Sequence, residues 1–302
     1  MNKILTGIMP ALVTPFNADR KTVNEKAARK LIEFLLNQGA DGFYILGSTG
    51  EGLVMTEEER MKMCEIVVSQ VAGRKPVICH VAAMNFDEAV RLSRFAEKAG
   101  VDALSAIPPL FFQYTDEDIY NYYKTLAQST CLPFIMYNHP AANGGLSASN
   151  VAKLFEVDNI TGVKWTVNNY YELMKLKNIT HGKMNIINGP DEMLVSGLAA
   201  GADAGIGTTY NVMLPEFLKI YKLFKEGNEA EARKVQMKVN QVITCMLEHG
   251  VLPSVKHMCK LMGFDVGETT FPMHSYSNEE RVALEEDLKK AAWPFDNGKY
   301  VC

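Results

Sequence analysis

The segment Ile160-Thr161-Gly162-Val163-Lys164-Trp165-Thr166 carries the most information about how this chain folds. Its β-branched and aromatic residues favour a strand, in which successive side chains face opposite sides. The two large apolar residues Val163 and Trp165 then share one face, while Lys164 lies on the other between a glycine and a threonine. If both faces are buried, the lysine stands where an unpaired charge costs several kcal/mol.

Lys164 has two interpretations at this point. Burial disfavours the charged form of an amine and makes it a usable nucleophile near neutral pH. Most lysines, however, lie at strand ends with the ammonium in water, and this segment alone favours that simpler interpretation. The rest of the chain has to decide between a reactive amine and a solvated one.

Short apolar or β-branched runs alternate with amphipathic helical stretches along most of the chain. Capping patterns, such as Thr22 with Glu25 and Thr115 with Asp118, mark several helix starts. The eight candidate strands are residues 7–13, 42–46, 77–81, 103–107, 134–138, 160–164, 185–188 and 204–207. Eight strand–helix units in succession predict an α/β fold, a closed (β/α)8 TIM barrel, with an open doubly wound sheet as the alternative.

Beyond Gly227 the pattern changes to helices alone, over residues 228–249, 253–262 and 277–292. A capping box, Ser277 with Glu280, opens the last of them. This tail is short for an independent domain. We therefore predict two parts, a barrel over residues 1–227 that carries the active site and a C-terminal helical extension over residues 228–302 packed on it.

Composition and charge narrow the classes of partner. Of the 302 residues 47% are hydrophobic and 22% charged, as in ordinary globular proteins, and the net charge is -4. Without basic runs, neither nucleic acid nor an anionic membrane is an expected partner, and no apolar run approaches the roughly 18 residues of a spanning helix. The six cysteines form no C-x-x-C pair and the histidines are dispersed, so we predict no metal site and a reducing cytoplasm. Small molecules are the expected partners.

Chemically capable residues stand where the predicted strands end. In a barrel the carboxyl ends of the strands form the active site, so these residues are expected to meet there. The candidates are Ser48, Thr49, Tyr137, Lys164, Asp191, Glu192, Gly207 and Thr208. They lie far apart in the sequence, and their common placement favours the reactive interpretation of the lysine.

Each neighbouring motif also has a purely structural interpretation. The stretch Gly47-Ser48-Thr49-Gly50 can converge backbone N–H groups and hydroxyls on a carboxylate, or it can be an ordinary glycine turn. Tyr137 can pass a proton or pack under a loop. Asp191 and Glu192 can bind a polyol or form the acidic first turn of a helix.

Four motifs together resemble one known family, the class I pyruvate lyases that include dihydrodipicolinate synthase and N-acetylneuraminate lyase. In chain order they are Gly47-Ser48-Thr49-Gly50-Glu51, Tyr137-Asn138-x-Pro140, Gly162-Val163-Lys164 and the run from Gly197 to Thr208. Their order and spacing extend the resemblance over essentially the whole chain.

Two regions resemble the lyase branch more than the synthase branch. The synthase branch usually carries an arginine shortly after its Tyr-Asn-x-Pro motif, to bind the carboxylate of a second substrate, and Ala142 stands at the corresponding position here. The stretches Lys164-Trp165-Thr166 and Asn188-Gly189-Pro190-Asp191-Glu192 are also similar to the lyase versions. The resemblance therefore implies reversible cleavage of N-acetylneuraminate to N-acetylmannosamine and pyruvate.

The resemblance also implies a role for each site residue. Lys164 would form a Schiff base with the keto group, Tyr137 would relay the proton, and Ser48 and Thr49 would hold the substrate carboxylate. The sugar tail would contact Thr166, Gly189, Asp191, Glu192, Gly207 and Thr208. The iminium acts as the electron sink, so neither a metal nor an organic cofactor is implied. The family further suggests a homotetramer.

One departure from the family concerns its proton relay. Many members carry a tyrosine after the fourth strand that reaches a neighbouring subunit's site, whereas this chain has Leu110-Phe111-Phe112-Gln113 there. We expect either a shorter relay or Tyr114 in that role. A sister aldolase acting on another 2-keto-3-deoxy acid, an altered synthase, and a non-catalytic sensor on the same fold are the alternative functions. The retained Lys164 and Tyr137 argue against the sensor.

Overall fold

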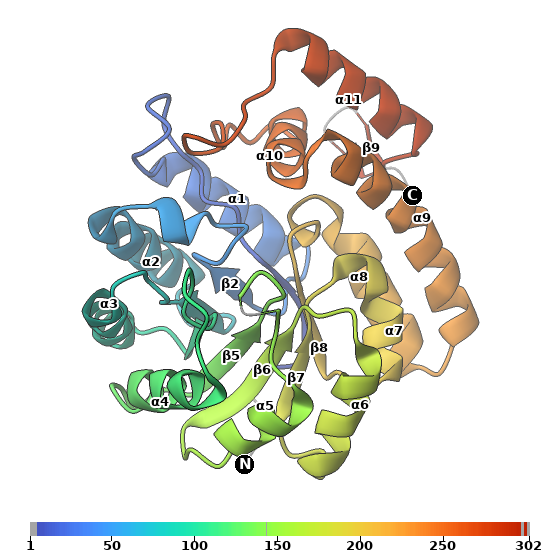
Figure 1. The fold of residues 1–302 in the computed structure, drawn as a ribbon. Coiled ribbons are helices and arrows are strands. Elements are labelled where there is room, and N and C mark those ends of the chain that lie inside the picture. The colour runs from blue at the N-terminus through green and yellow to red at the C-terminus, as the bar shows by residue number, and fades with distance from the viewer. Residues whose placement is uncertain (1–4, 143, 297–298, 301–302) are drawn as a thin grey trace.

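A computed structural model describes residues 5–142, 144–296 and 299–300 and shows a ring of strands surrounded by helices (Figure 1). The strands of the described ring are β1 (Gly7–Pro10), β2 (Phe43–Ile45), β3 (Val77–His80), β4 (Ala103–Ala106), β5 (Phe134–Asn138), β6 (Ile160–Trp165), β7 (Asn185–Asn188) and β8 (Ala204–Gly207). They pair in parallel in the order β1-β8-β7-β6-β5-β4-β3-β2. Each strand is followed by a crossover on the outside, as parallel pairing requires.

The first and second strands complete the ring. Ala11 forms a parallel bridge with Tyr44, and the N–H of Leu12 donates to the carbonyl of Tyr44 over 2.9 Å. The sheet is thus a closed barrel and not an open doubly wound sheet, which confirms the predicted TIM barrel. The first strand is shorter than expected, because beyond Pro10 the chain pairs with β2.

Helices cover the outside of the barrel, and the fold continues into further helices after the eighth strand. Those of the barrel are α1 (Glu25–Asn37), α2 (Glu57–Val71), α3 (Phe86–Ala99), α4 (Asp116–Ala127), α5 (Ala148–Leu154), α6 (Tyr170–Ile179), α7 (Leu194–Ala199) and α8 (Tyr210–Lys225). The later ones are α9 (Glu229–His249), α10 (Val251–Leu261) and α11 (Asn278–Lys290). A short antiparallel pair, β9 (Phe295–Asp296) and β10 (Lys299–Tyr300), follows.

Most predicted helix starts agree with the structure. The Thr115 and Ser277 side chains form complete capping boxes at α4 and α11. The prediction for Thr22 was wrong, because α1 begins after Asn24, whose side chain accepts the N–H of Ala27. Thr22 instead donates its hydroxyl to Asp19 over 2.7 Å within the preceding turn. Two polar residues so close together offer competing caps, and the sequence did not decide between them.

The C-terminal helices α9 to α11 pack along one side of the barrel, with α9 against α8 (Figure 1). The predicted division at residue 227 falls in the turn between these two helices. Both predicted parts include residues outside those that the structure describes, namely 1–4, 143, 297–298 and 301–302. The division of the chain into a barrel and a helical extension stays a prediction.

A buried ion pair joins the C-terminal helices to the loop that follows β2. The ammonium of Lys256, on α10, lies 2.5 Å from Glu51, and both side chains are at most 1% exposed. Glu51 also accepts the N–H and the hydroxyl of Thr270 over 2.7 and 2.8 Å, and Lys256 donates to the carbonyl of Glu268 over 3.0 Å. Burial lowers the pKa of Lys256, and the carboxylate beside it opposes that shift.

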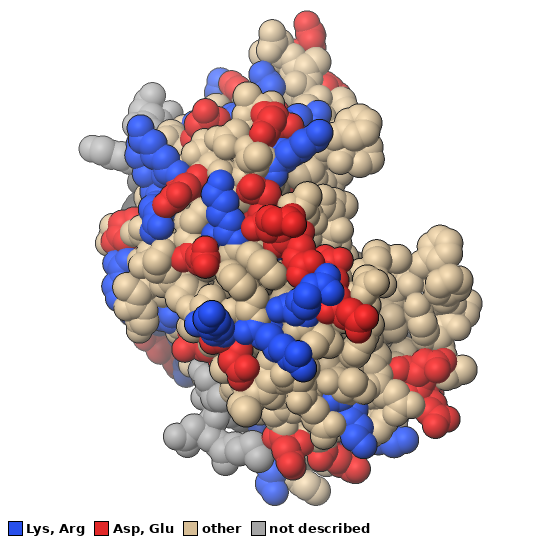
Figure 2. All heavy atoms as spheres, turned by 90° about the vertical axis from the view of Figure 1, so that its left-hand side faces the viewer, with Lys and Arg blue, Asp and Glu red and all other residues tan. Residues whose placement is uncertain are grey.

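Charged side chains of both signs occur on the face of the molecule that Figure 2 shows. Figure 2 shows acidic and basic side chains intermixed over the face that carries α2 to α4, without a patch of one sign. Within the described part of the chain, no helix combines the length and the apolar character needed to cross a membrane.

Lys256→Met tests how firmly the ion pair ties the extension to the barrel. The substitution leaves the Glu51 carboxylate buried without its counter-charge, so we expect the free energy of unfolding to fall by about 3–5 kcal/mol in urea denaturation. Lys290→Met is the matched control, because it removes an exposed pair with Asp287 and should change stability little. Equal losses in the two variants would contradict a contribution from burial.

Candidate active site

Lys164 lies on β6 with its side chain inside the barrel. It is 5% exposed, and its ammonium lies 4.1 Å from the ring centroid of Tyr137 and 4.8 Å from that of Tyr44. The register pairs Lys164 directly with Tyr137 on β5. Two aromatic faces attract the cation in place of water. Of the two interpretations left open by the sequence, the solvated lysine is therefore wrong.

Tyr44 and His80 line the interior beside the lysine, and the sequence analysis did not single them out. The hydroxyl of Tyr44 and that of Ser105 lie 3.1 Å apart, and the Tyr44 ring stands edge-on to that of Tyr137 at 5.9 Å. Burial, and secondarily Tyr137, raise the pKa of Tyr44 well above its ordinary value. Alternation could have identified this residue, but its equally large neighbour Phe43 left the phase of the strand undecided.

His80, on β3, is an uncharged neighbour of the lysine. Its Nε2 accepts the N–H of Ile107 over 3.3 Å, and its ring stands edge-on to Tyr137 at 6.1 Å. Burial, followed by the charges of Arg60 and Lys164, lowers the pKa of this imidazole well below its ordinary value. The interior around the amine is thus aromatic and neutral.

The predicted carboxylate-binding turn after β2 is linked to the end of β8. The hydroxyls of Thr49 and Thr208 lie 2.6 Å apart, and Thr49 is 6% exposed. Ser48, the other predicted ligand, is exposed at the turn. Gly52 closes the turn, because a Cβ there would stand 1.9 Å from the carbonyl oxygen of Leu46. Only glycine therefore fits at this position of the turn.

Asp191 follows β7 in the short 3-10 helix η2 (Asp191–Met193), with its side chain turned toward β8. One carboxylate oxygen accepts both the N–H and the hydroxyl of Thr209 over 2.7 Å. The other is buried without a protein partner and lies over Gly207, where a Cβ would stand only 1.8 Å from it. A buried acceptor without a partner can receive a hydroxyl of a ligand.

The environment of Asp191 raises its pKa to about 6. Burial is the largest cause and the Thr209 hydrogen bonds oppose it; Glu192 raises the pKa further, and Lys164 lowers it. The carboxyl thus titrates within two pH units of neutrality, unlike an ordinary aspartate. Sequence patterns alone do not reveal this shift, since it depends on burial by residues distant in the chain.

Helix α9 supports the segment that carries the acidic pair. Gln236 donates to the backbone carbonyl of Asp191 and Asn240 donates to that of Glu192, each over 3.1 Å. The two amides also bond each other over 2.8 Å. Glu192 itself is half-buried. Its backbone is therefore fixed from outside the barrel while its side chain remains partly accessible.

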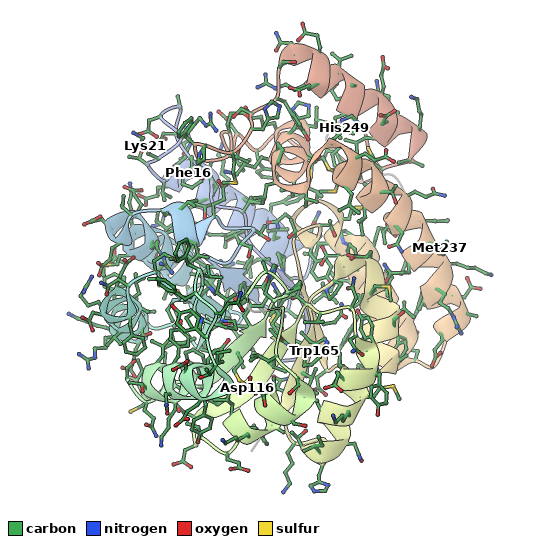
Figure 3. The ribbon with its side chains drawn as sticks, in the orientation of Figure 1. Phe16, Lys21, Asp116, Trp165, Met237 and His249 are labelled. Carbon is green, nitrogen blue, oxygen red and sulfur yellow. The ribbon has the colours of Figure 1, made fainter. Side chains whose placement is uncertain are left out.

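Thr166 and Gly189 lie side by side just beyond the ends of β6 and β7. The Thr166 hydroxyl is buried and has no hydrogen-bond partner. A Cβ at Gly189 would stand 2.0 Å from it, so only glycine leaves the space beside this hydroxyl open. Trp165, 1% exposed, lies within the ring of helices in Figure 3, on the strand face opposite to Lys164.

Tyr114, proposed as a relay residue, lies away from these side chains. It lines a pocket between α3 and α4 of about 380 Å³, together with Met84, Leu110 and Tyr122. Its ring stands edge-on to Phe112 at 6.2 Å. A role for Tyr114 in proton transfer stays a prediction. Over the described residues, no three His, Cys, Asp or Glu side chains are grouped so that they could hold a metal ion.

Comparisons with known proteins agree with this geometry. The family model described as Dihydrodipicolinate synthetase family matches residues 4–291. The chain belongs to this family. Membership places it among aldolases and lyases.

Relatives within the family carry two different names. N-acetylneuraminate lyase of Rhizobium meliloti is 34% identical over 96% of this chain and 96% of its own length. A structure of N-acetylneuraminate lyase from Fusobacterium nucleatum complexed with pyruvate has a TM-score of 0.89, with 33% identity over 96% of this chain and 98% of the other. Dihydrodipicolinate synthase from Aquifex aeolicus has a TM-score of 0.90, with 29% identity over 97% and 100%.

The raised pKa of Asp191 predicts a pH-dependent stability. The folded protein holds this proton more tightly than the unfolded chain, so the stabilisation is present at low pH and lost as pH rises from 3.8 to about 6. Across that window, the free energy of unfolding of the wild type should fall relative to that of Asp191→Asn, by up to about 3 kcal/mol. Urea denaturation at several pH values measures the difference. A constant difference would contradict the raised pKa.

Proposed function

We propose that this chain is a Schiff-base aldolase that cleaves N-acetylneuraminate reversibly to N-acetylmannosamine and pyruvate. The observation that carries the proposal is the amine of Lys164, buried between the rings of Tyr137 and Tyr44 inside the barrel. Inside the barrel and paired in register with Tyr137, this amine is placed to attack the carbonyl carbon of a bound substrate.

The first steps attach the substrate to the lysine. Lys164 attacks the C2 ketone of the open-chain sugar acid, and loss of water leaves a protonated Schiff base. Thr49, with Ser48 beside it in the turn, holds the substrate carboxylate and so places C2 against the amine. The Thr49–Thr208 contact fixes one of these hydroxyls across the barrel mouth.

The next steps break the carbon–carbon bond. Tyr137 takes up the proton of the C4 hydroxyl as its own phenolic proton passes to the substrate carboxylate, the C3–C4 bond breaks, and the electron pair of that bond moves to the iminium nitrogen to form an enamine. The aldehyde N-acetylmannosamine leaves. Protonation of the enamine at C3 and hydrolysis of the iminium then free pyruvate and restore Lys164.

The sugar tail lies against the residues after β7 and β8. The unpartnered carboxylate oxygen of Asp191 accepts a hydrogen bond from one hydroxyl of the tail, and the unpartnered Thr166 hydroxyl bonds another. Glu192 and Thr208 flank these two residues. Gly189 and Gly207 keep the space open, since a Cβ at either position would stand within 2.0 Å of one of those oxygens.

Two further observations favour the lyase over the synthase alternative. Ala142, at the position where the synthase branch is expected to carry its arginine, is 1% exposed. A buried methyl group cannot bind a second carboxylate. The lyase names of the relatives from Rhizobium meliloti and Fusobacterium nucleatum support the same choice. The homotetramer implied by the resemblance belongs to this proposal as well.

Trapping with pyruvate tests the nucleophile. Borohydride added together with pyruvate should inactivate the protein and leave one reduced pyruvate adduct on Lys164, located by peptide mass spectrometry. Lys256 is the internal control, because it is also buried but is paired with Glu51 over 2.5 Å and should remain unmodified. Lys164→Ala should lose turnover and stay folded. An adduct on another lysine, or none, would overturn the mechanism.

The choice of substrate is tested separately. Purified protein should release pyruvate from N-acetylneuraminate, and in the reverse direction it should prefer N-acetylmannosamine to glyceraldehyde and aspartate semialdehyde as the acceptor. A coupled assay for pyruvate measures both. Preference for aspartate semialdehyde would point to the synthase, and preference for glyceraldehyde to a sister aldolase.

A further inference from the structure

His139 is a histidine at the barrel mouth with no role so far. It follows the inward-facing Tyr137 by two positions, so it faces the same side of the sheet just beyond the end of β5. The ladder continues to this level, because the N–H of Thr166 donates to the carbonyl of Asn138 over 2.9 Å. The ring of His139 stands edge-on to that of Tyr137, with centroids 5.2 Å apart.

Local contacts fix which nitrogen of His139 carries the proton. Its Nδ1 accepts the N–H of Ala141 over 3.1 Å, so the neutral ring holds its hydrogen on Nε2. Burial, and secondarily the charge of Lys164, lower the pKa of this imidazole. The ring therefore presents a neutral N–H donor at neutral pH and lies close enough to sense the charge of the lysine.

The side chain of Asn138 bonds the backbone of the loop that follows β5. Its carboxamide exchanges two hydrogen bonds with the backbone of Leu146, over 3.0 and 2.7 Å, and so closes the loop after β5. That closure holds the start of the loop in place, His139 included. Across from it stand the buried, unpartnered hydroxyl of Thr166 and the space left by Gly189. A donor and an unpartnered hydroxyl thus stand two residues beyond the level of Lys164 and Tyr137.

We propose that His139 is a substrate-binding residue that donates its Nε2–H to the oxygen on C4, the carbon of the breaking C3–C4 bond that becomes the aldehyde. The inference rests on the proposed aldolase function. Substrate C2 is held at Lys164, and C4 stands two carbons further toward the tail-binding residues, which places its oxygen at the level of His139 and Thr166. As the C4 hydroxyl loses its proton to Tyr137, a donor here stabilises the charge that develops on that oxygen.

His139→Leu and His139→Gln test this role together. Leucine keeps the volume and removes the donor, whereas glutamine places an amide N–H at the reach of Nε2. We expect kcat/KM for cleavage to fall by about ten- to a hundred-fold in the leucine variant and to recover in part in the glutamine variant. The rate of borohydride trapping with pyruvate alone should stay within about two-fold of wild type, because pyruvate has no C4. His274→Leu, the same change at an exposed histidine, is the control.

The outcomes separate this inference from the proposed function. If the wild type forms no pyruvate adduct, or accepts no aldehyde, the function and the inference fail together. If the wild type is active and the leucine variant cleaves at the wild-type rate, the inference alone is overturned. It is overturned as well if trapping with pyruvate falls as much as cleavage, since His139 would then act on the lysine and not on the C4 oxygen.

Discussion

Closure of the parallel sheet is the constraint on which the site depends. The bond from Leu12 to the carbonyl of Tyr44 completes the ring, and every second side chain of each strand must then share one narrow interior. Large residues from neighbouring strands fill that interior and leave no room for bulk water. The side chain of Lys164 is buried because the barrel is closed around it.

Helices outside the barrel hold two of the segments that form the candidate site. Lys256 on α10 holds the loop after β2 through Glu51, and Gln236 and Asn240 on α9 hold the backbone after β7. Both walls of the candidate site are thus fixed by elements that contribute no proposed catalytic group. A buried ion pair is a weak source of stability but fixes geometry firmly. Its position beside the carboxylate-binding turn fits that use.

Local patterns allowed the barrel, most helix starts and the level of Lys164 to be predicted from the sequence. They failed where two candidates compete within a turn, as Thr22 and Asn24 do at α1. They also gave no sign of contacts between distant segments. Glu51 and Lys256 are ordinary charged residues in the sequence, and only the fold shows that they are buried together. The raised pKa of Asp191 is another effect that the sequence does not show, because its largest cause is burial in the folded protein.

The separation of bond chemistry from tail recognition has an evolutionary consequence. Lys164 and Tyr137 lie on adjacent strands, whereas Asp191 and Glu192 lie on a segment supported by α9. Under the proposed mechanism, mutations in that segment or in its supporting helix can change the accepted sugar and leave the nucleophile in place. A duplicated gene would then need few substitutions to acquire a new aldehyde partner. Solved structures that share this barrel do carry different enzyme names.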